Sequence, residues 1–165
     1  MSEVTIQSIG PEDLPDVVEM VHELAAFEKA PESCHLTVPQ LERALFAEHA
    51  ALFGHVARAR LDGGTTRAVG FALWFLNFST WDGTHGIYLE DLYVRASERG
   101  SGLGRRLLAT LAATCVERGY TRLQWSVLDW NPARDFYRAI GAEENLDWVP
   151  CRVTGVALTS LATGA

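Results

Sequence analysis

A glycine-rich turn between a predicted strand and a predicted helix is the part of this sequence best suited to bind a phosphate group. The pattern of residues 87–94 predicts a strand, and Gly100, Gly102 and Gly104 follow it at the start of an amphipathic segment. Glycines let backbone N–H groups approach an anion closely, and the first turn of a helix adds the positive end of its dipole. We therefore expect this turn to bind a polyphosphate-bearing ligand, although a plain surface turn that begins a helix would have the same residues.

Arginines are concentrated near this turn in a chain whose net charge is −7. We expect four of them to surround the bound anion: Arg95, Arg99, Arg105 and Arg106. No Gly-Lys-Ser/Thr follows the glycines, which excludes a P-loop, and their spacing is not that of the dinucleotide-binding fold. The net negative charge of the chain argues against nucleic acid and anionic membranes as partners.

Two neighbouring carboxylates lie in the strand before the turn, at a change in its alternation. The apolar residues before Glu90 keep one phase of the strand alternation, whereas Leu92 and Val94 keep the other. A slip of one residue at Glu90 and Asp91 predicts a β-bulge, and bulges redirect side chains near active sites.

Glu28 is a further carboxylate, at the end of a predicted helix. Residues 14–25 have the apolar periodicity of a helix that begins after Asp13, and one more turn on the apolar face reaches Glu28. Its carboxylate either faces inward at the helix end or lies in solvent beyond a helix that has already ended.

The order of the predicted elements indicates an α+β fold in a single domain of residues 1–165. Strands are expected over residues 4–9, 51–61, 68–78, 87–94, 123–128 and 148–153, and helices after Asp13 and Thr37 and over residues 105–118 and 133–140. This order predicts a mostly antiparallel sheet with one βαβ crossover at the glycine turn.

Cysteine content and hydropathy indicate a cytoplasmic protein. The three cysteines, Cys34, Cys115 and Cys151, are odd in number and lack metal-binding spacing, so we expect reduced thiols and no metal. No apolar run approaches the ~20 residues that span a bilayer, and no signal peptide is expected.

The Arg-Gly-x-Gly-x-Gly turn, together with the segment from Asn131 through Tyr137 to Gly141, resembles the GNAT acetyltransferases over nearly the whole chain. Within that superfamily the sequence is most similar to the diamine (spermidine/spermine) and thialysine N-acetyltransferases. The residues that carry this closer likeness are 23–29, Ser79-Thr80-Trp81, Tyr88-Leu89-Glu90-Asp91-Leu92-Tyr93-Val94 and Leu128-Asp129-Trp130-Asn131.

The resemblance implies a GNAT fold with a splayed central pair of strands, and acetyl-CoA as cosubstrate without a metal. The residues it assigns to acetyl-CoA are Leu92, Tyr93, Val94, Arg99, Gly100, Ser101, Gly102, Leu103, Gly104, Arg105 and Asn131. Glu90, directly or through water, is the implied general base, and Tyr137 the acid that protonates the leaving thiolate. Phe27, Glu28, Trp81, Glu90 and Asp91 are the implied contacts of the amine, and relatives of this kind are commonly homodimers.

The sequence departs from the family pattern at Asn131, which lies six residues before Tyr137 where the family usually has seven. Ala133 and Gly141 match the pattern, so the helix register is kept and the loop is one residue shorter. This departure puts the ligand role of Asn131 in question more than that of Tyr137.

The resemblance leaves several substrates and functions open. Ser79-Thr80 before Trp81 favours a lysine-like amino acid over a long polyamine, and the carboxylate of an amino acid would need a donor, for which Lys29 and Arg152 are candidates. The alternatives are a CoA-binding regulatory module without turnover, against which Glu90 and Tyr137 argue, and a protein N-acetyltransferase.

Overall fold

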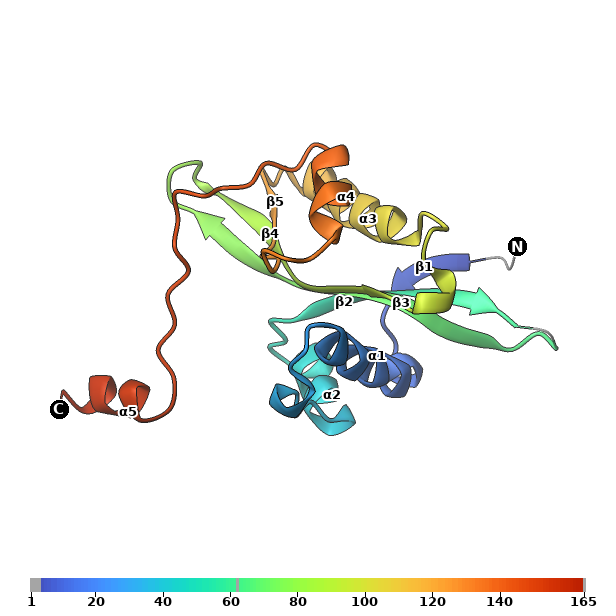
Figure 1. The fold of residues 1–165 in the computed structure, drawn as a ribbon, viewed down its shortest axis with the longest axis horizontal. Helices are drawn as coiled ribbons and strands as arrows, with labels where there is room; N and C mark the ends of the chain where they lie inside the picture. The colour runs from blue at the N-terminus through green and yellow to red at the C-terminus, as the bar shows by residue number, and fades with distance from the viewer. Residues whose placement is uncertain (1–3, 62, 165) are drawn as a thin grey trace. The chain divides into compact units, whose positions relative to one another are not determined.

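A computed structural model describes residues 4–61 and 63–164 of the chain. Its strands form one mixed sheet in the order β1-β2-β3-β4-β5, in which only β4 and β5 are parallel (Figure 1). The strands are β1 Val4–Ser8, β2 Phe53–Arg60, β3 Thr66–Ser79, β4 Thr84–Val94 and β5 Leu123–Gln124. The α-helices are α1 Leu14–Phe27, α2 Val38–Phe46, α3 Leu103–Arg118, α4 Ala133–Ala139 and α5 Gly155–Thr163. The chain divides into two compact units, residues 1–126 and residues 127–165, and each is described by itself.

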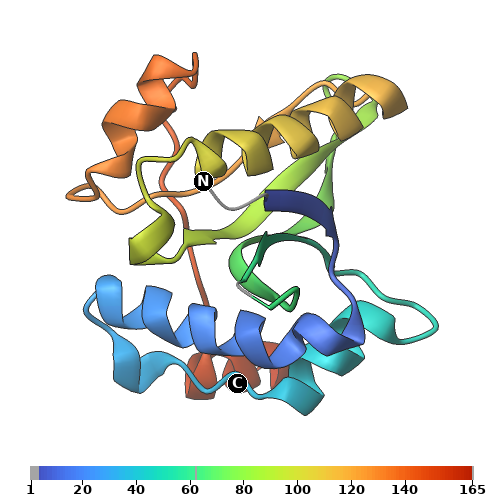
Figure 2. The same ribbon diagram turned by 90° about the vertical axis from the view of Figure 1, so that its right-hand side faces the viewer.

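Helices cover both faces of the sheet in the first unit. Helices α1 and α2 lie against one face and α3 against the other (Figure 2). The core on the α1 side joins Val17 and Met20 of α1, Leu41 of α2, and Phe71 and Leu73 of β3. All five side chains are at most 3% exposed, so this apolar layer positions the end of α1 against β3 and β4.

An ion-pair cluster also attaches α1 to the end of β4. The side chain of Arg95, directly after β4, is 9% exposed and contacts Asp16, Glu19 and Glu23 of α1. The guanidinium lies 2.5 Å from a carboxylate oxygen of Glu19, and its Nε donates to the carbonyl of Ala68. Because a buried guanidinium needs such partners, Arg95 restricts where β4 can lie relative to α1.

A side chain caps the start of α2, the helix expected after Thr37. Gln40 Oε1 accepts the backbone N–H of Thr37 at 2.8 Å. Asp13 does precede α1, but its side chain accepts from the backbone N–H of Gly10 and pairs with Arg58 instead of capping that helix.

In the second unit, α4 is held by charge-assisted hydrogen bonds. Arg134 donates to both carboxylate oxygens of Glu144, at 2.8 and 2.9 Å, and Arg138 donates to Glu144 at 3.0 Å. A bidentate pair of this kind fixes the chain after α4 to the helix itself.

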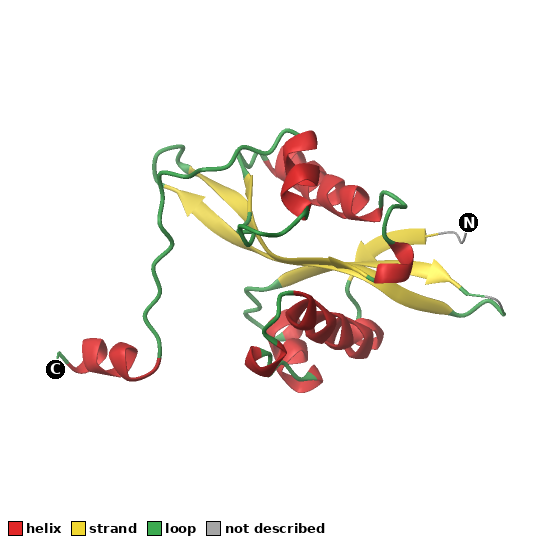
Figure 3. Ribbon diagram, in the orientation of Figure 1, coloured by secondary structure: helices red, strands yellow, loops and turns green. Residues whose placement is uncertain are grey.

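Two expected strands near the C-terminus differ from the structure. The prediction of a strand over residues 148–153 is wrong, since no strand forms there and the unpredicted helix α5 follows (Figure 3). Val149, Cys151 and Val153 are exposed and pair with no other strand in the described part of the chain, and an alternating segment without a partner leaves its backbone groups unpaired. The strand expected over residues 123–128 is only two residues long.

Candidate active site

The predicted β-bulge is present in β4. Leu89 lies opposite Trp74 of β3, whereas Asp91 lies opposite Leu73, so Glu90 has no partner in β3. The consequence is that Leu92 and Val94 stay on the sheet face that carries Leu89. Val94 and Leu107 of α3 both lie close to Gly70, which places this face on the α3 side.

The bulge brings Asp91 and Glu90 together with Glu28 at the end of α1. Burial raises the pKa of Asp91 to about 6, and the negative charges of Glu90 and Glu28 add to that shift. Burial also raises the pKa of the Glu28 carboxyl. Since neighbouring carboxylates repel one another, this cluster favours a cation between them.

Glu28 takes the first of the two positions expected from the sequence: its side chain faces inward at the end of α1. Helix α1 ends at Phe27, and Glu28 is the residue directly after it, with its N–H still bonded to the carbonyl of Leu24 at 2.9 Å. The helical bond continues far enough to keep the side chain half-buried, on the side of Asp91.

One edge of β4 is open where it approaches the glycine turn. The N–H of Arg95 donates to the carbonyl of Val69 in β3 at 2.9 Å. Because N–H groups point alternately to the two sides of a strand, those of Leu92 and Val94 point away from β3. On that side β5 pairs only with Ile87 and Tyr88, so no described strand covers the edge farther along.

The glycine turn has the backbone conformation that its sequence indicates. Gly100 and Gly102 have φ of 78° and 79°, a left-handed conformation that favours glycine. Gly102 directly precedes α3, and no side chain caps that helix start. A Cβ atom added at Gly104 would meet nothing within 4 Å, so the space beside the first turn of α3 is open.

Of the four arginines expected around the turn, two contact other parts of the fold. The prediction for Arg95 is wrong because the acidic residues of α1 bind it, and that for Arg106 is wrong because it donates to the carbonyl of Val4 at 2.7 Å. Arg99 does lie beside the open edge, where its Nε donates to the carbonyl of Val94 at 3.0 Å. The side chain of Arg105 is exposed on α3.

Two aromatic residues expected at the amine site have different surroundings. The guanidinium of Arg99 lies 5.3 Å from the ring centroids of both Phe27 and Tyr93, so Phe27, the residue before Glu28, lies beside Arg99. Trp81 lies in the turn between β3 and β4 and is 90% exposed, and no described residue packs it against the carboxylates.

Tyr137 and Asn131 belong to the second unit. Tyr137 lies on α4 with its ring centroid 5.3 Å from that of Phe136. Asn131 Oδ1 accepts the N–H of Ala133 at 2.9 Å, so its amide oxygen helps to begin α4. This is a local turn contact of the amide oxygen.

Glu23 is a residue of this region that the sequence analysis did not assign. It contacts Arg95 and hydrogen-bonds the hydroxyl of Tyr93, whose pKa is raised by burial and by this carboxylate. Glu23 therefore positions the side chain on which Arg99 lies. The spacing of Asp16, Glu19 and Glu23 on one face of a helix was the available signal.

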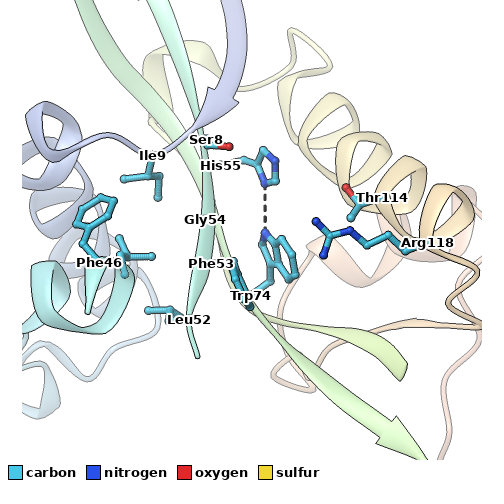
Figure 4. Close-up of a pocket in the computed structure, with 11 residues that line it drawn as sticks. Ser8, Ile9, Phe46, Leu52, Phe53, Gly54, His55, Trp74, Thr114 and Arg118 are labelled. Carbon is cyan, nitrogen blue, oxygen red and sulfur yellow. Dashed lines mark hydrogen bonds between the residues drawn. The ribbon is translucent and has the colours of Figure 1, made fainter. Parts of the chain in front are cut away.

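A pocket of about 280 Å³ lies where β2 begins, and none of the predicted site residues lines it (Figure 4). Within it, the indole N–H of Trp74 donates to Nδ1 of His55 at 3.2 Å, and Phe53 stacks on Trp74 with ring centroids 4.7 Å apart. Burial lowers the pKa of His55. No group of three residues suited to hold a metal ion occurs among the described residues, and none of their helices is long and apolar enough to cross a membrane.

Comparison with known proteins assigns the chain to a family. Residues 18–142 match the model of the acetyltransferase (GNAT) family. The chain is 31% identical to the thialysine N-epsilon-acetyltransferase of Bos taurus, over 98% of this chain and 99% of that protein. It is 39% identical to L-ornithine N5-acetyltransferase NATA1 of Arabidopsis thaliana, over 56% of this chain and 41% of that protein. The solved structure of integron cassette protein VCH_CASS6, from the mobile metagenome of V. cholerae, has a TM-score of 0.77 and 28% identity over 98% of both chains.

The chain therefore belongs to the acetyltransferase (GNAT) family. This confirms the resemblance drawn from the sequence, the α+β GNAT fold and the expected class of enzyme, an acetyl-CoA-dependent N-acetyltransferase that acts on a small amine. The matched residues extend across both compact units.

Proposed function

We propose that the protein transfers the acetyl group of acetyl-CoA to a primary amine of a small cationic molecule, by direct attack in a ternary complex. The observation that carries this proposal is the cluster of Glu28, Glu90 and Asp91 beside the open edge of β4. The cluster would attract an ammonium group, and the open edge offers N–H groups to an acetyl carbonyl.

The backbone around the glycine turn is suited to acetyl-CoA. Residues 100–105 would bind the pyrophosphate through N–H groups, since the first turn of α3 has no side-chain cap and the space at Gly104 is open. Arg99 and Arg105 would add positive charge. Acetyl-CoA, when bound, supplies the acetyl group as a thioester. The N–H groups of Leu92 and Val94 would donate to its carbonyl oxygen and stabilise the negative charge that develops there.

The carboxylates would prepare the amine for attack. An ammonium group has no lone pair, so it must lose a proton first, and Glu90 is the proposed acceptor, directly or through water. Glu90 is exposed at the bulge and can reach a bound ligand, whereas Asp91 is half-buried. Asp91 and Glu28 would bind the charge of the amine before that proton leaves.

Tyr137 is the proposed general acid. Its hydroxyl would donate a proton to the sulfur that leaves when the amide bond forms, so that the departing group is a thiol. The ligand role of Asn131 has less support than the acid role of Tyr137, because the amide oxygen of Asn131 already accepts the N–H of Ala133. Its amide nitrogen is the group that could still donate to the ligand.

A lysine-like amino acid such as thialysine is the proposed substrate class. The relative from Bos taurus is named for thialysine and matches nearly the full chain, and the partial match from Arabidopsis thaliana is named for L-ornithine. Both are amino acids with an amine at the end of the side chain. Ser79-Thr80 before Trp81 agrees with this choice over a long polyamine.

A homodimer is proposed as the working assembly. Residues 142–163 carry large apolar side chains that are between 70% and 83% exposed, namely Leu146, Trp148, Val149, Val156 and Leu161. Exposed apolar residues in this number are characteristic of an interaction surface. Light scattering after size exclusion should give twice the mass of the chain, and Trp148→Glu should reduce it; a monomeric wild-type protein would refute the assembly.

The experiment that tests the activity measures acetyl-CoA-dependent thiol release with thialysine, lysine, ornithine, putrescine and spermidine. We expect turnover of the amino acids, and a loss of about 10²–10⁴ in kcat with Glu90→Gln. Acetyl-CoA binding without turnover of any amine would instead favour the regulatory module. Acetylation of a protein substrate alone would favour the protein N-acetyltransferase.

A further inference from the structure

We propose that a second hollow, between the end of α2 and β3, binds the α-carboxylate of the amino acid substrate, and that Arg43 is the donor. The inference rests on the proposed function, and it adds the residue that distinguishes an amino acid from a diamine. Neither Lys29 nor Arg152, the candidates from the sequence, lines this hollow.

The hollow has a volume of about 480 Å³ and a mostly apolar lining with two basic side chains. Arg43 and His49 contribute the basic groups, and Leu52, Phe75 and Leu76 contribute the apolar wall. Such a lining suits the stem of a lysine-like side chain together with one anionic end group.

The hollow and the carboxylate cluster lie on the same face of the sheet. Asp91 is directly opposite Leu73, and directly opposite residues have their side chains on one face. Phe75 is two residues beyond Leu73 on β3 and so returns to that face, the face of α1 and α2. Two residues of extended strand cover roughly 6.6 Å, a span comparable to the four-carbon stem of lysine.

An aromatic pair lies between the two ends of this path. Phe75 stacks on Tyr88 of β4 with ring centroids 5.0 Å apart, and the hydroxyl of Tyr88 hydrogen-bonds Ser126 at 2.8 Å. The stacked pair offers an apolar surface to a methylene or thioether chain. An amine at Asp91 could then extend past Phe75 toward Arg43.

Arg43 differs from the arginines that have structural partners. Arg58, Arg67, Arg95 and Arg134 each pair with carboxylates, whereas no ion pair or side-chain hydrogen bond of Arg43 exists among the described residues. Its guanidinium is exposed at the hollow and free for a carboxylate, which the planar fork can bind with two hydrogen bonds.

The test compares thialysine with bis(2-aminoethyl) sulfide, the same molecule without its carboxylate. Loss of a charge-assisted contact predicts that Arg43→Gln raises KM for thialysine about tenfold or more and leaves kcat/KM for the sulfide diamine unchanged. Arg43→Lys should restore part of the loss, since lysine keeps the charge but not the fork. Arg60→Gln, at an exposed arginine outside the hollow, is the matched control and should change neither substrate.

Different outcomes would overturn the two proposals. Equal effects of Arg43→Gln on both substrates, or none on thialysine, would refute the role of Arg43. Failure of the wild-type protein to acetylate either amine would refute the proposed activity instead. In that case calorimetry can still test Arg43, by measuring the affinity of the CoA-loaded protein for thialysine and for the sulfide diamine. If Arg43 binds the carboxylate, the affinity for thialysine must be the higher of the two.

Discussion

Asp91 lies directly opposite Leu73, a residue of the hydrophobic core, across the β3–β4 pair. A carboxylate in that position loses hydration on one side and meets Glu90 and Glu28 on the other. The bulge thus produces an acidic group whose proton is released near pH 6, within the range in which enzymes operate.

Asp91→Asn should raise KM for the amine by about tenfold to a hundredfold, because a charged partner of the ammonium is removed. In the wild-type protein, kcat/KM should fall as the pH drops below about 6, since Asp91 with a pKa raised to about 6 is protonated there. The variant should lose this acid limb. Profiles measured from pH 5 to pH 8 with thialysine decide the matter, and a limb that survives in Asp91→Asn would assign it to another group.

Gly104→Ala should separate ligand binding from folding. Its φ is not positive and an added Cβ meets nothing within 4 Å, so the fold should gain about 0.5–1 kcal/mol from the better helix former. If the pyrophosphate lies against this backbone, KM for acetyl-CoA should rise at least tenfold, roughly 1.4 kcal/mol. Urea unfolding and acetyl-CoA kinetics measure the two effects.

The control for that variant is Gly102→Ala. Because Gly102 has a φ of 79°, alanine is strained there, and both stability and acetyl-CoA affinity should fall. An unchanged KM for acetyl-CoA in Gly104→Ala would place the pyrophosphate elsewhere.

Tyr137→Phe should lower kcat by about 10²–10⁴ while KM for both substrates changes little, because only the proton donor is removed. The ring and its contact with Phe136 remain, so α4 should still fold. Steady-state kinetics with Tyr120→Phe as the control would check this. A loss of less than tenfold would mean that the thiolate is protonated from another source.

His55 should make the stability of the fold depend on pH. The indole of Trp74 can only donate, so Nδ1 of His55 must be unprotonated to accept it. The folded-state pKa is lowered, so neutral His55 stabilises the fold above its usual pKa, roughly 6.5. That contribution is lost as the pH falls through the folded-state pKa, because the unfolded state binds the proton more readily.

Urea unfolding at pH 7.5 and pH 5.5 measures this effect. The wild-type protein should lose about 1 kcal/mol more on acidification than His55→Gln, whose amide oxygen can accept the same bond at either pH. His35→Gln, at an exposed histidine, should behave as the wild type does. Identical losses in the wild type and in His55→Gln would show that the imidazole does not contribute.

Much of the site could be predicted because its signals are local. The bulge follows from a change in the alternation of apolar residues on either side of Glu90, and that change is visible in the sequence alone. The left-handed turn follows from Gly100 and Gly102, since few other residues adopt that conformation readily.

The errors concern contacts between distant segments. The position of Arg95 in the sequence indicates a basic group near the turn, but its partners come from α1, about 75 residues earlier. The expected strand at residues 148–153 has suitable alternation, yet a strand forms only where a neighbour accepts its hydrogen bonds. No local pattern in the sequence indicates a role for Arg43. Its hollow is formed by α2 and by β3, a strand that begins twenty residues after α2 ends.

The bulge also makes substitution and deletion at Glu90 two different experiments. Replacing the residue removes a carboxylate, whereas excising it would restore an uninterrupted ladder from Leu89 onward. Every later side chain of β4 would then keep its partner in β3 and its face of the sheet, because Asp91 opposite Leu73 would directly follow Leu89 opposite Trp74. In any family alignment, a gap at this column would therefore mark a missing bulge and a missing base within an unchanged core.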